Sequence, residues 1–200
     1  MSKIYRITLE ELLERYADGQ RDFTRFTIRY TDREFENGID LRGVKFRGDS
    51  LSRLVYALQN SNLSGADLRS INLHRLGLDR CNLSGALLNK ADLWRTCFHK
   101  ANLSGANLTG ANLQEVSFTY ANLRKANLSD TKLIETYFGC ADLSGANFTN
   151  TNIGGIDFSR ANLTEVDFTK ASIGDTWNEK NFKNCFFQNT IMPDGSIRSS

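Results

Sequence analysis

A large apolar residue recurs every five positions through more than half of this 200-residue chain. The stretch ANLSGANLTGANL, residues 101–113, repeats nearly the same five letters. On a helix, leucines five residues apart are rotated by roughly 140° from one another, and on a strand successive ones point to opposite faces. Neither element gathers these leucines into one core, so the repeat requires a backbone that bends at regular intervals.

The repeating unit has one inward pair and one turn. From residue 61 to 175 the chain divides into 23 consecutive pentapeptides without an insertion. The central position, i, holds Leu, Phe or Ile; position i−2 is mostly small, i−1 is usually Asn or Asp, and i+1 and i+2 favour Ser, Thr, Gly or a charge. Two inward residues separated by one polar residue are typical of a short extended segment, and the polar pair has turn chemistry. Repeated bending in one sense predicts a solenoid with a column of leucines inside.

The number of pentapeptides in one coil follows from the aromatic residues. Phenylalanine occupies position i at a spacing of 20, at Phe98, Phe118, Phe138 and Phe158. A spacing of 15 would instead place Phe98 beside Leu113 and destroy the pattern. We therefore predict four pentapeptides per coil, with coils stacked about 4.8 Å apart in a rod about 28 Å long. Asn82 and Asn102 then share an outward column whose amides hydrogen-bond to one another.

Units such as ANLSG, ADLSG and ANLRK closely resemble the pentapeptide repeat family. The resemblance implies an all-β fold, a right-handed quadrilateral β-helix. Its four sides agree with the spacing of 20, whereas the handedness is implied by the resemblance alone. The stretch LLERYADGQRDF, residues 12–23, and the C-terminal end are similar to the ends of cyanobacterial members of the family.

The N-terminal stretch TLEELLERYADGQ, residues 8–20, predicts a helix that covers the open end of the rod. Thr8 and Glu11 form a capping box, and Gly19 supplies the stop. The apolar side of the helix contains Leu9, Leu12, Leu13, Tyr16 and Ala17.

The C-terminal stretch, residues 176–200, lacks the five-residue period but contains several apolar residues, so we predict a second cap there. Pro193-Asp194-Gly195 predicts a turn within it. The apolar residues of this stretch are Phe182, Phe186, Phe187 and Ile191. We expect one structural domain in four parts: an N-terminal helical cap (1–20), irregular first coils with two extra residues (21–60), the regular repeat (61–175), and a C-terminal cap and tail (176–200).

The charge distribution weighs against nucleic acid as a partner and against mimicry of it. The net charge is +2, and residues 61–175 carry 11 basic and 11 acidic side chains. Members of the resembled family that protect gyrase imitate DNA, which requires about one negative charge per 1.7 Å. A DNA-mimicking, gyrase-protecting protein is therefore the alternative function, disfavoured by the neutral repeat.

No apolar run is long enough for a signal-peptide core or a membrane span, so we expect a cytoplasmic protein that does not bind membranes. The four cysteines lie far apart without a CxxC, and reduced thiols are expected. Cys81, at an i−2 position, should lie in the core.

The chain contains no motif of a catalytic, phosphate-binding or metal-binding site. His74 and His99 are its only histidines, and both occupy the outward i+1 position. The outward aspartates sit at i−1, where the repeat itself favours Asn or Asp, and we interpret them as structural. No enzymatic activity, cofactor or metal is expected.

Outward residues that the repeat does not favour indicate a contact site for another protein, such as a regulator. One side carries His74, Trp94, Arg95 and Ile134, and the next side carries His99, Tyr120 and Tyr137. Exposed Trp, Tyr and Arg in one region are typical of interaction hot spots. The sequence thus predicts a monomer or weak dimer that serves as an interaction or scaffold protein.

Overall fold

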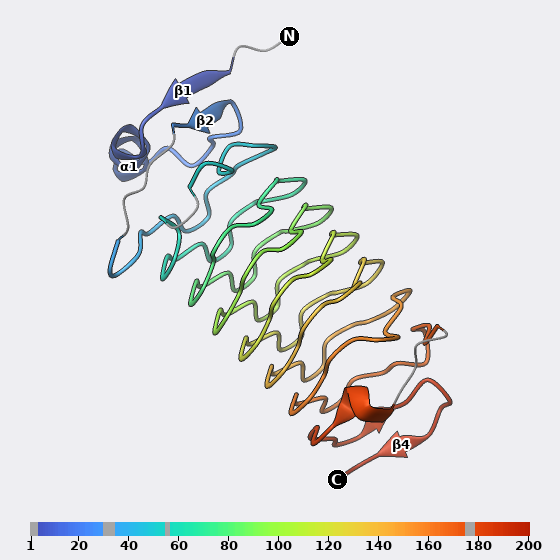
Figure 1. The fold of residues 1–200 in the computed structure, drawn as a ribbon. Coiled ribbons are helices and arrows are strands. Elements are labelled where there is room, and N and C mark those ends of the chain that lie inside the picture. Colours follow the sequence, from blue (N-terminus) through green and yellow to red (C-terminus); the bar gives the residue numbers. More distant parts are fainter. Residues whose placement is uncertain (1–3, 30–34, 55–56, 175–178) are drawn as a thin grey trace.

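The chain winds into a stack of similar coils with a helix at one end and a small hairpin at the other (Figure 1). The computed structural model describes residues 4–29, 35–54, 57–174 and 179–200. Parts of the predicted irregular segment 21–60 and the predicted boundary at 175/176 lie outside these residues. The elements in chain order are β1 (Tyr5–Ile7), α1 (Leu9–Ala17), β2 (Phe26–Ile28), the 3-10 helix η1 (Glu179–Phe182), β3 (Thr190–Ile191) and β4 (Ile197–Arg198).

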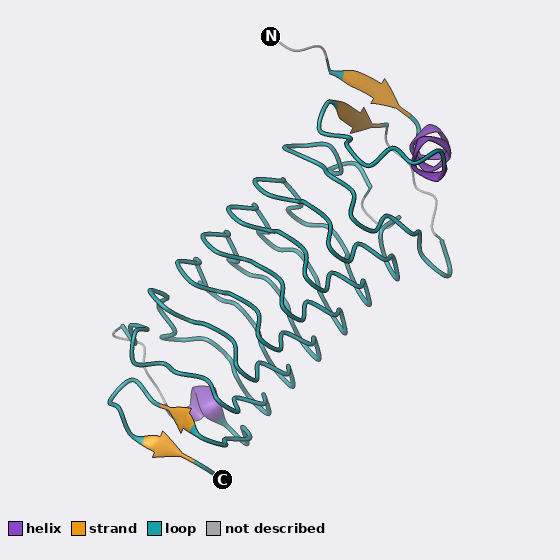
Figure 2. Ribbon diagram, turned by 180° about the vertical axis from the view of Figure 1, so that it is seen from behind, coloured by secondary structure: helices purple, strands orange, loops and turns teal. Residues whose placement is uncertain are grey.

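Neighbouring coils pair in parallel at a spacing of 20, which confirms four pentapeptides per coil. Successive bridges join Asn62 to Asn82, Asp67 to Leu87, Asn72 to Asp92 and Gly77 to Cys97. Because the chain turns after each short extended segment, the ladder consists of isolated bridges. Among the described residues, strands of two or three residues form only near the ends, where β1 pairs in parallel with β2 and β3 pairs antiparallel with β4 (Figure 2).

The turns between pentapeptides all use the same backbone conformation. Every fifth residue from 65 to 165 has a positive φ, for example +64° at Gly105, +56° at Glu115 and +61° at Tyr120. The amide of Ala106 donates to the carbonyl of Leu103 at 3.0 Å, across one such turn. This is the φ of the second central residue in a type II turn. The polar pair of each pentapeptide therefore makes the predicted turn.

The i−1 side chains hold the turns and link the coils. The Oδ1 atom of Asn102 accepts the amide of Ser104 at 3.1 Å, and its Nδ2 donates to Asn82 Oδ1 at 3.3 Å, as predicted. The same turn bond confirms a structural role for the i−1 aspartates: Asp67, Asp92, Asp142, Asp157 and Asp167 each accept the amide two residues on.

The predicted phenylalanine column fills the core. The rings of Phe98, Phe118 and Phe138 are stacked with centroids 5.2 Å apart, and Phe158 follows at 5.4 Å. Phe182 of η1 continues the column at 5.2 Å from Phe158. The buried hydroxyls of Thr96 and Thr136 donate hydrogen bonds to backbone carbonyls in the core at 2.8 Å. Cys81 is buried, as predicted.

Helix α1 has the predicted caps at both ends. Thr8 Oγ1 accepts the Glu11 amide at 3.1 Å, and Glu11 Oε2 accepts the Thr8 amide at 2.8 Å. At the other end, Gly19 has φ +93°, and the next amide, that of Gln20, donates to the carbonyl of Arg15.

The apolar side of α1 is narrower than predicted. Leu9 and Leu12 are buried, and Leu13 and Tyr16 pack against the core, but Ala17 is exposed. At 100° per residue, Ala17 is rotated by about 90° from the centre of the stripe, so its inclusion was wrong.

The coils at both ends are longer than those between them. Bridges join Asp40 to Asn62 and Lys45 to Asp67, two positions beyond the regular spacing, which confirms the two extra residues expected near the N-terminus. At the C-terminal end, bridges join Asn162 to Phe186 and Asp167 to Ile191, four positions beyond the regular spacing.

Two apolar residues near the C-terminus, Phe186 and Ile173, are exposed, and for Ile173 this is contrary to prediction. Phe186 is 53% exposed because it continues the outward i−1 column of Asn162, while Phe187 beside it is buried. Ile173 was predicted as a central core residue and is 36% exposed. The chain turns back at Pro193, where the Gly195 amide donates to the Met192 carbonyl at 2.9 Å, and a small pocket remains between Ile173 and that turn.

Candidate functional site

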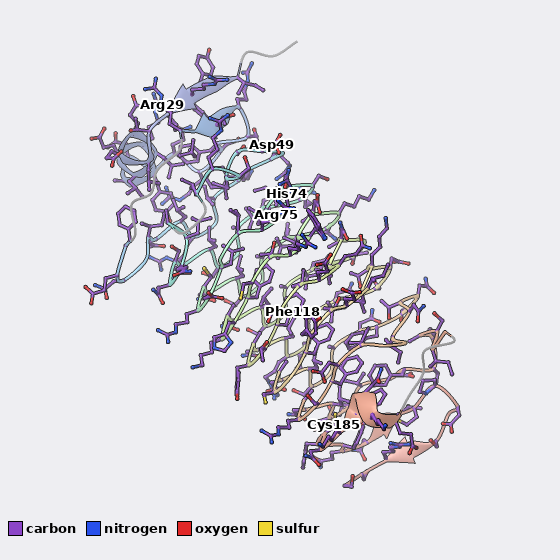
Figure 3. All side chains as sticks on the ribbon, in the orientation of Figure 1. Arg29, Asp49, His74, Arg75, Phe118 and Cys185 are labelled. Atoms are coloured by element: carbon purple, nitrogen blue, oxygen red, sulfur yellow. The ribbon has the colours of Figure 1, made fainter. Side chains whose placement is uncertain are left out.

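All seven residues predicted to contact a partner lie on or beside one outer face of the rod, here called the aromatic face. Its central column consists of Gly77, Cys97, Ser117 and Tyr137, bridged in that order, and the phenylalanine column lies directly beneath. One bordering corner carries His74, Arg75, Trp94, Arg95, Glu115 and Ile134, and the other carries Arg80, His99, Lys100 and Tyr120. His74 and Arg75 mark the first corner in Figure 3, with Phe118 further along the coil stack.

Two guanidinium groups lie over the ring of Trp94. The guanidinium carbons of Arg75 and Arg95 lie 4.6 and 4.5 Å from the indole ring centroid. The indole Nε1 donates to Glu115 Oε1 at 3.1 Å, and Arg95 Nε donates to Glu115 Oε2 at 2.6 Å. These two hydrogen bonds, from Arg95 and then from Trp94, hold the pKa of the Glu115 carboxyl below its ordinary value. The cluster therefore fixes the orientation of a large aromatic side chain at the surface.

The repeat explains why these side chains meet. Arg75, Arg95 and Glu115 follow one another at the coil spacing, so they occupy the same turn position on three successive coils, each with φ near +60°. The sequence places Arg75, Arg95 and Glu115 at the i+2 position beside Trp94, but only Trp94 and Arg95 were predicted as contact residues. The coil spacing of 20 residues identifies Arg75 and Glu115 as the neighbours of Arg95 on the two adjacent coils.

His74 lies at the edge of the same cluster. Its ring is 6.3 Å from that of Trp94 in an edge-on arrangement, and its Nδ1 is 3.9 Å from Asp92 Oδ2. Asp92 in turn accepts the backbone amide of Trp94 at 3.3 Å. The structure thus brings His74, Trp94 and Arg95 together.

A second group stands at the opposite corner. The rings of His99 and Tyr120 meet edge-on with centroids 5.6 Å apart, and Lys100 Nζ lies 5.9 Å from the Tyr120 ring centroid. The His99 amide donates to Asp79 Oδ1 at 3.1 Å. Tyr120 nevertheless remains 54% exposed.

Ile134 and Tyr137 lie on the same face without joining either group. Ile134 is 60% exposed and borders a pocket of about 350 Å³ that Lys132, Asn152 and Gly154 also line. Tyr137 is 47% exposed in the central column. The C-terminal half of the aromatic face therefore presents three exposed apolar or aromatic side chains, namely Tyr120, Ile134 and Tyr137.

A second pocket, of about 380 Å³, adjoins Tyr120. Gly139 contributes no side chain there, and Cys140, Arg160 and Lys183 form part of its lining. These groups do not form a recognisable nucleophile and base pair.

The thiols for which a shift is resolved are poor nucleophiles. Burial is the main cause that raises the pKa of Cys97 to about 11, and the nearby Asp79 raises it further. Burial also raises the pKa of Cys81 to about 12 and that of Cys185 to about 11. Cys185, which the sequence did not place, donates its S–H to the Phe158 carbonyl. Within the described part of the chain, no cluster of three or more His, Cys, Asp or Glu side chains could hold a metal ion.

The comparisons with known families agree with the coil pattern. A model described as "Pentapeptide repeat region" matches residues 71–148, and one described as "Pentapeptide repeats (8 copies)" matches residues 141–176. Together they cover more than half of the chain. No curated protein matches. None of the helices in the described ranges is long and apolar enough to cross a membrane.

Solved structures of similar proteins include HetL, a pentapeptide repeat protein involved in heterocyst differentiation regulation in the cyanobacterium Nostoc. It is 23% identical, the alignment covers 96% of this chain and 100% of HetL, and the TM-score is 0.31. A pentapeptide repeat protein of the cyanobacterium Cyanothece is 36% identical over 48% of this chain and 54% of its own, with a TM-score of 0.22. The plasmid-mediated fluoroquinolone resistance protein QnrB1 is 16% identical over 82% and 83% of the two chains, with a TM-score of 0.36.

Proposed function

Because this chain belongs to the pentapeptide repeat family, we propose that it is a non-enzymatic module, a right-handed quadrilateral β-helix that presents its aromatic face to another protein. The family is generally non-catalytic. The observation that carries the proposal is the fixed Trp94, held by Arg75, Arg95 and Glu115 on the same face as the exposed Tyr120, Ile134 and Tyr137.

Such a surface suits protein binding for two physical reasons. Trp, Tyr and Arg supply much of the binding free energy in protein interfaces. Side chains that are already ordered in the free protein lose little conformational entropy on binding. The stacked coils beneath the face provide a rigid support, since each backbone segment is hydrogen-bonded to its neighbours. We place the module in the cytoplasm, where its four free cysteines would stay reduced.

The test is an affinity pull-down from lysate of the native host, read by mass spectrometry. Wild type is compared with Trp94→Ala/Tyr137→Ala and with the control Leu87→Ala/Phe186→Ala, which removes two exposed apolar side chains outside the aromatic face. We expect one partner that the first variant loses and the control retains, while the melting temperatures of all three proteins stay close. Recovery of the same proteins by all three would contradict the proposal.

A further inference from the structure

We propose that the aromatic face binds an extended segment of its partner that is acidic at one end and hydrophobic at the other. This inference rests on the proposed function and names the chemistry of the partner. It follows from the distribution of charge and of exposed apolar side chains along the face.

The N-terminal half of the face is basic at both borders. Arg75 and Arg95 stand at one corner and Arg80 and Lys100 at the other, all exposed. Arg95 is paired with Glu115, whereas Arg75, Arg80 and Lys100 form no ion pair with any other described residue.

The two carboxylates that border this half, Asp79 and Asp92, accept hydrogen bonds from neutral amides and keep their charge, but the four basic side chains outnumber them. Asp79 accepts the amide of His99, and Asp92 accepts the amide of Trp94 and the side-chain amide of Asn112. Between the two basic corners the central column contains only Gly77 and Cys97, which are small. An extended acidic chain can therefore approach the backbone there and meet a positive charge on either side.

The C-terminal half is acidic along its first corner and in its central column, whereas Arg160 and Lys183 lie by the second corner. Glu115 and Glu135 occupy the first corner, and Asp157 continues the central column after Tyr137. Ile134 and Tyr137 expose their side chains beside these acidic groups, and Tyr120 exposes its ring at the second corner. A partner segment that lies along the rod should accordingly end in hydrophobic residues over this half.

The change in charge along the aromatic face favours a polypeptide over a single-stranded nucleic acid as the bound partner. A nucleic acid carries negative charge along its whole length, so it would meet Glu115, Glu135 and Asp157 on the second half of the face. A polypeptide changes its chemistry from one residue to the next and can match both halves.

The experiment uses the full chain and a synthetic fluorescein-labelled peptide with a run of alternating Asp and Glu followed by Leu-Phe. Fluorescence anisotropy measures its binding to wild type, to Arg75→Ala/Lys100→Ala and to the control Lys90→Ala/Lys125→Ala. The four substituted residues share the turn position, with φ of +61°, +58°, +57° and +55°, so the two variants make the same change in charge on different corners. We expect affinity to fall about tenfold in the first variant, equivalent to about 1.4 kcal/mol, and to stay unchanged in the control.

The inference is overturned if the acidic peptide does not bind, if a peptide with Lys in place of Asp and Glu binds as tightly, or if both variants lose affinity equally. It is also overturned if labelled oligothymidylate binds more tightly than the peptide and loses affinity in the first variant, because the face would then bind nucleic acid. A partner that depends on Trp94 and Tyr137 in the pull-down, together with no binding of the acidic peptide, would leave the proposed function standing and remove only this inference.

Discussion

At the scale of single residues, the turn between pentapeptides demands more of the backbone than of the side chain. The i+2 residue adopts a left-handed conformation whether it is Gly105, Glu115 or Tyr120. For a residue with a Cβ this conformation costs about 1 kcal/mol relative to the right-handed one. Glycine relieves that cost, but the position also faces solvent, so charged and aromatic residues can occupy it and give each corner its own chemistry.

Gly38 and Gly105 separate the cost of the conformation from the cost of crowding. Both have similar positive φ, +67° and +64°, but a Cβ on Gly38 would overlap the backbone of Asn60 and Ser61, whereas one on Gly105 would meet no atom within 4 Å. Gly105→Ala should lower the free energy of unfolding by about 1 kcal/mol. Gly38→Ala should lower it by several times as much, as measured by urea unfolding. Equal effects of the two substitutions would show that the close approach of Gly38 to the next coil is not maintained.

At the scale of structural elements, the regular coils were predictable because each position holds the same kind of residue as the position one coil earlier. The four phenylalanines at a spacing of 20, from Phe98 to Phe158, indicate the coil length. The capping box of α1 was equally predictable, since its bonds are local. The path of the C-terminal coil was not predictable, because the period does not indicate the four extra residues that place Phe186 in the outward column of Asn162.

The candidate site was predictable in part for the same reason. The outward positions of Trp94 and Tyr137 follow directly from the period. That Arg75 and Arg95 both cover the indole of Trp94, and that Glu115 accepts its N–H, depends on side-chain conformations that a periodic pattern does not specify.

The phenylalanine column should be the element most sensitive to truncation. Phe118 is fully buried, with a stacked ring 5.2 Å away on either side. Phe118→Ala should lower the free energy of unfolding by about 3–5 kcal/mol, because it leaves a cavity that the neighbouring coils cannot close. Tyr137→Ala, one coil on but outward, is the control and should change it by about 0.5 kcal/mol or less. A near-neutral Phe118→Ala would mean that the column is not part of the core.

At the scale of the whole molecule, ionised carboxylates support the fold along most of its length. The pKa of Asp22 is lowered mainly by a hydrogen bond from Thr24, that of Asp67 mainly by one from Arg69, and that of Asp167 mainly by one from Thr169. Arg47, one coil before Asp67, reaches the same carboxylate at 2.7 Å. The ionised form of these groups is therefore favoured in the folded protein over the unfolded chain.

The sign of the pH dependence follows from these lowered pKa values. The unfolded chain, with aspartate pKa near 3.9, takes up protons first as the pH falls, so the stabilisation is present above about pH 4 and is lost below it. The urea midpoint should consequently be lower at about pH 3 than at about pH 7. Asp67→Asn keeps an acceptor for the turn but removes the ion pairs, so it should lower the midpoint at neutral pH and reduce the loss on acidification. A midpoint that does not change with pH would contradict this account.

Because the coil length is constant, the side of the rod on which a residue lies depends on the number of pentapeptides that precede it. Inserting or deleting four whole pentapeptides within the regular coils would change the length of the rod by one layer and keep every later residue on its own side. Inserting or deleting a single pentapeptide would preserve the repeat and its core, but it would rotate everything that follows by one side of the coil. Deletion of one pentapeptide between Trp94 and Tyr137 would thus leave both residues intact on a rod that no longer presents them together. In the evolutionary history of such a chain, duplications of four pentapeptides conserve a surface, whereas those of one, two or three create a new one.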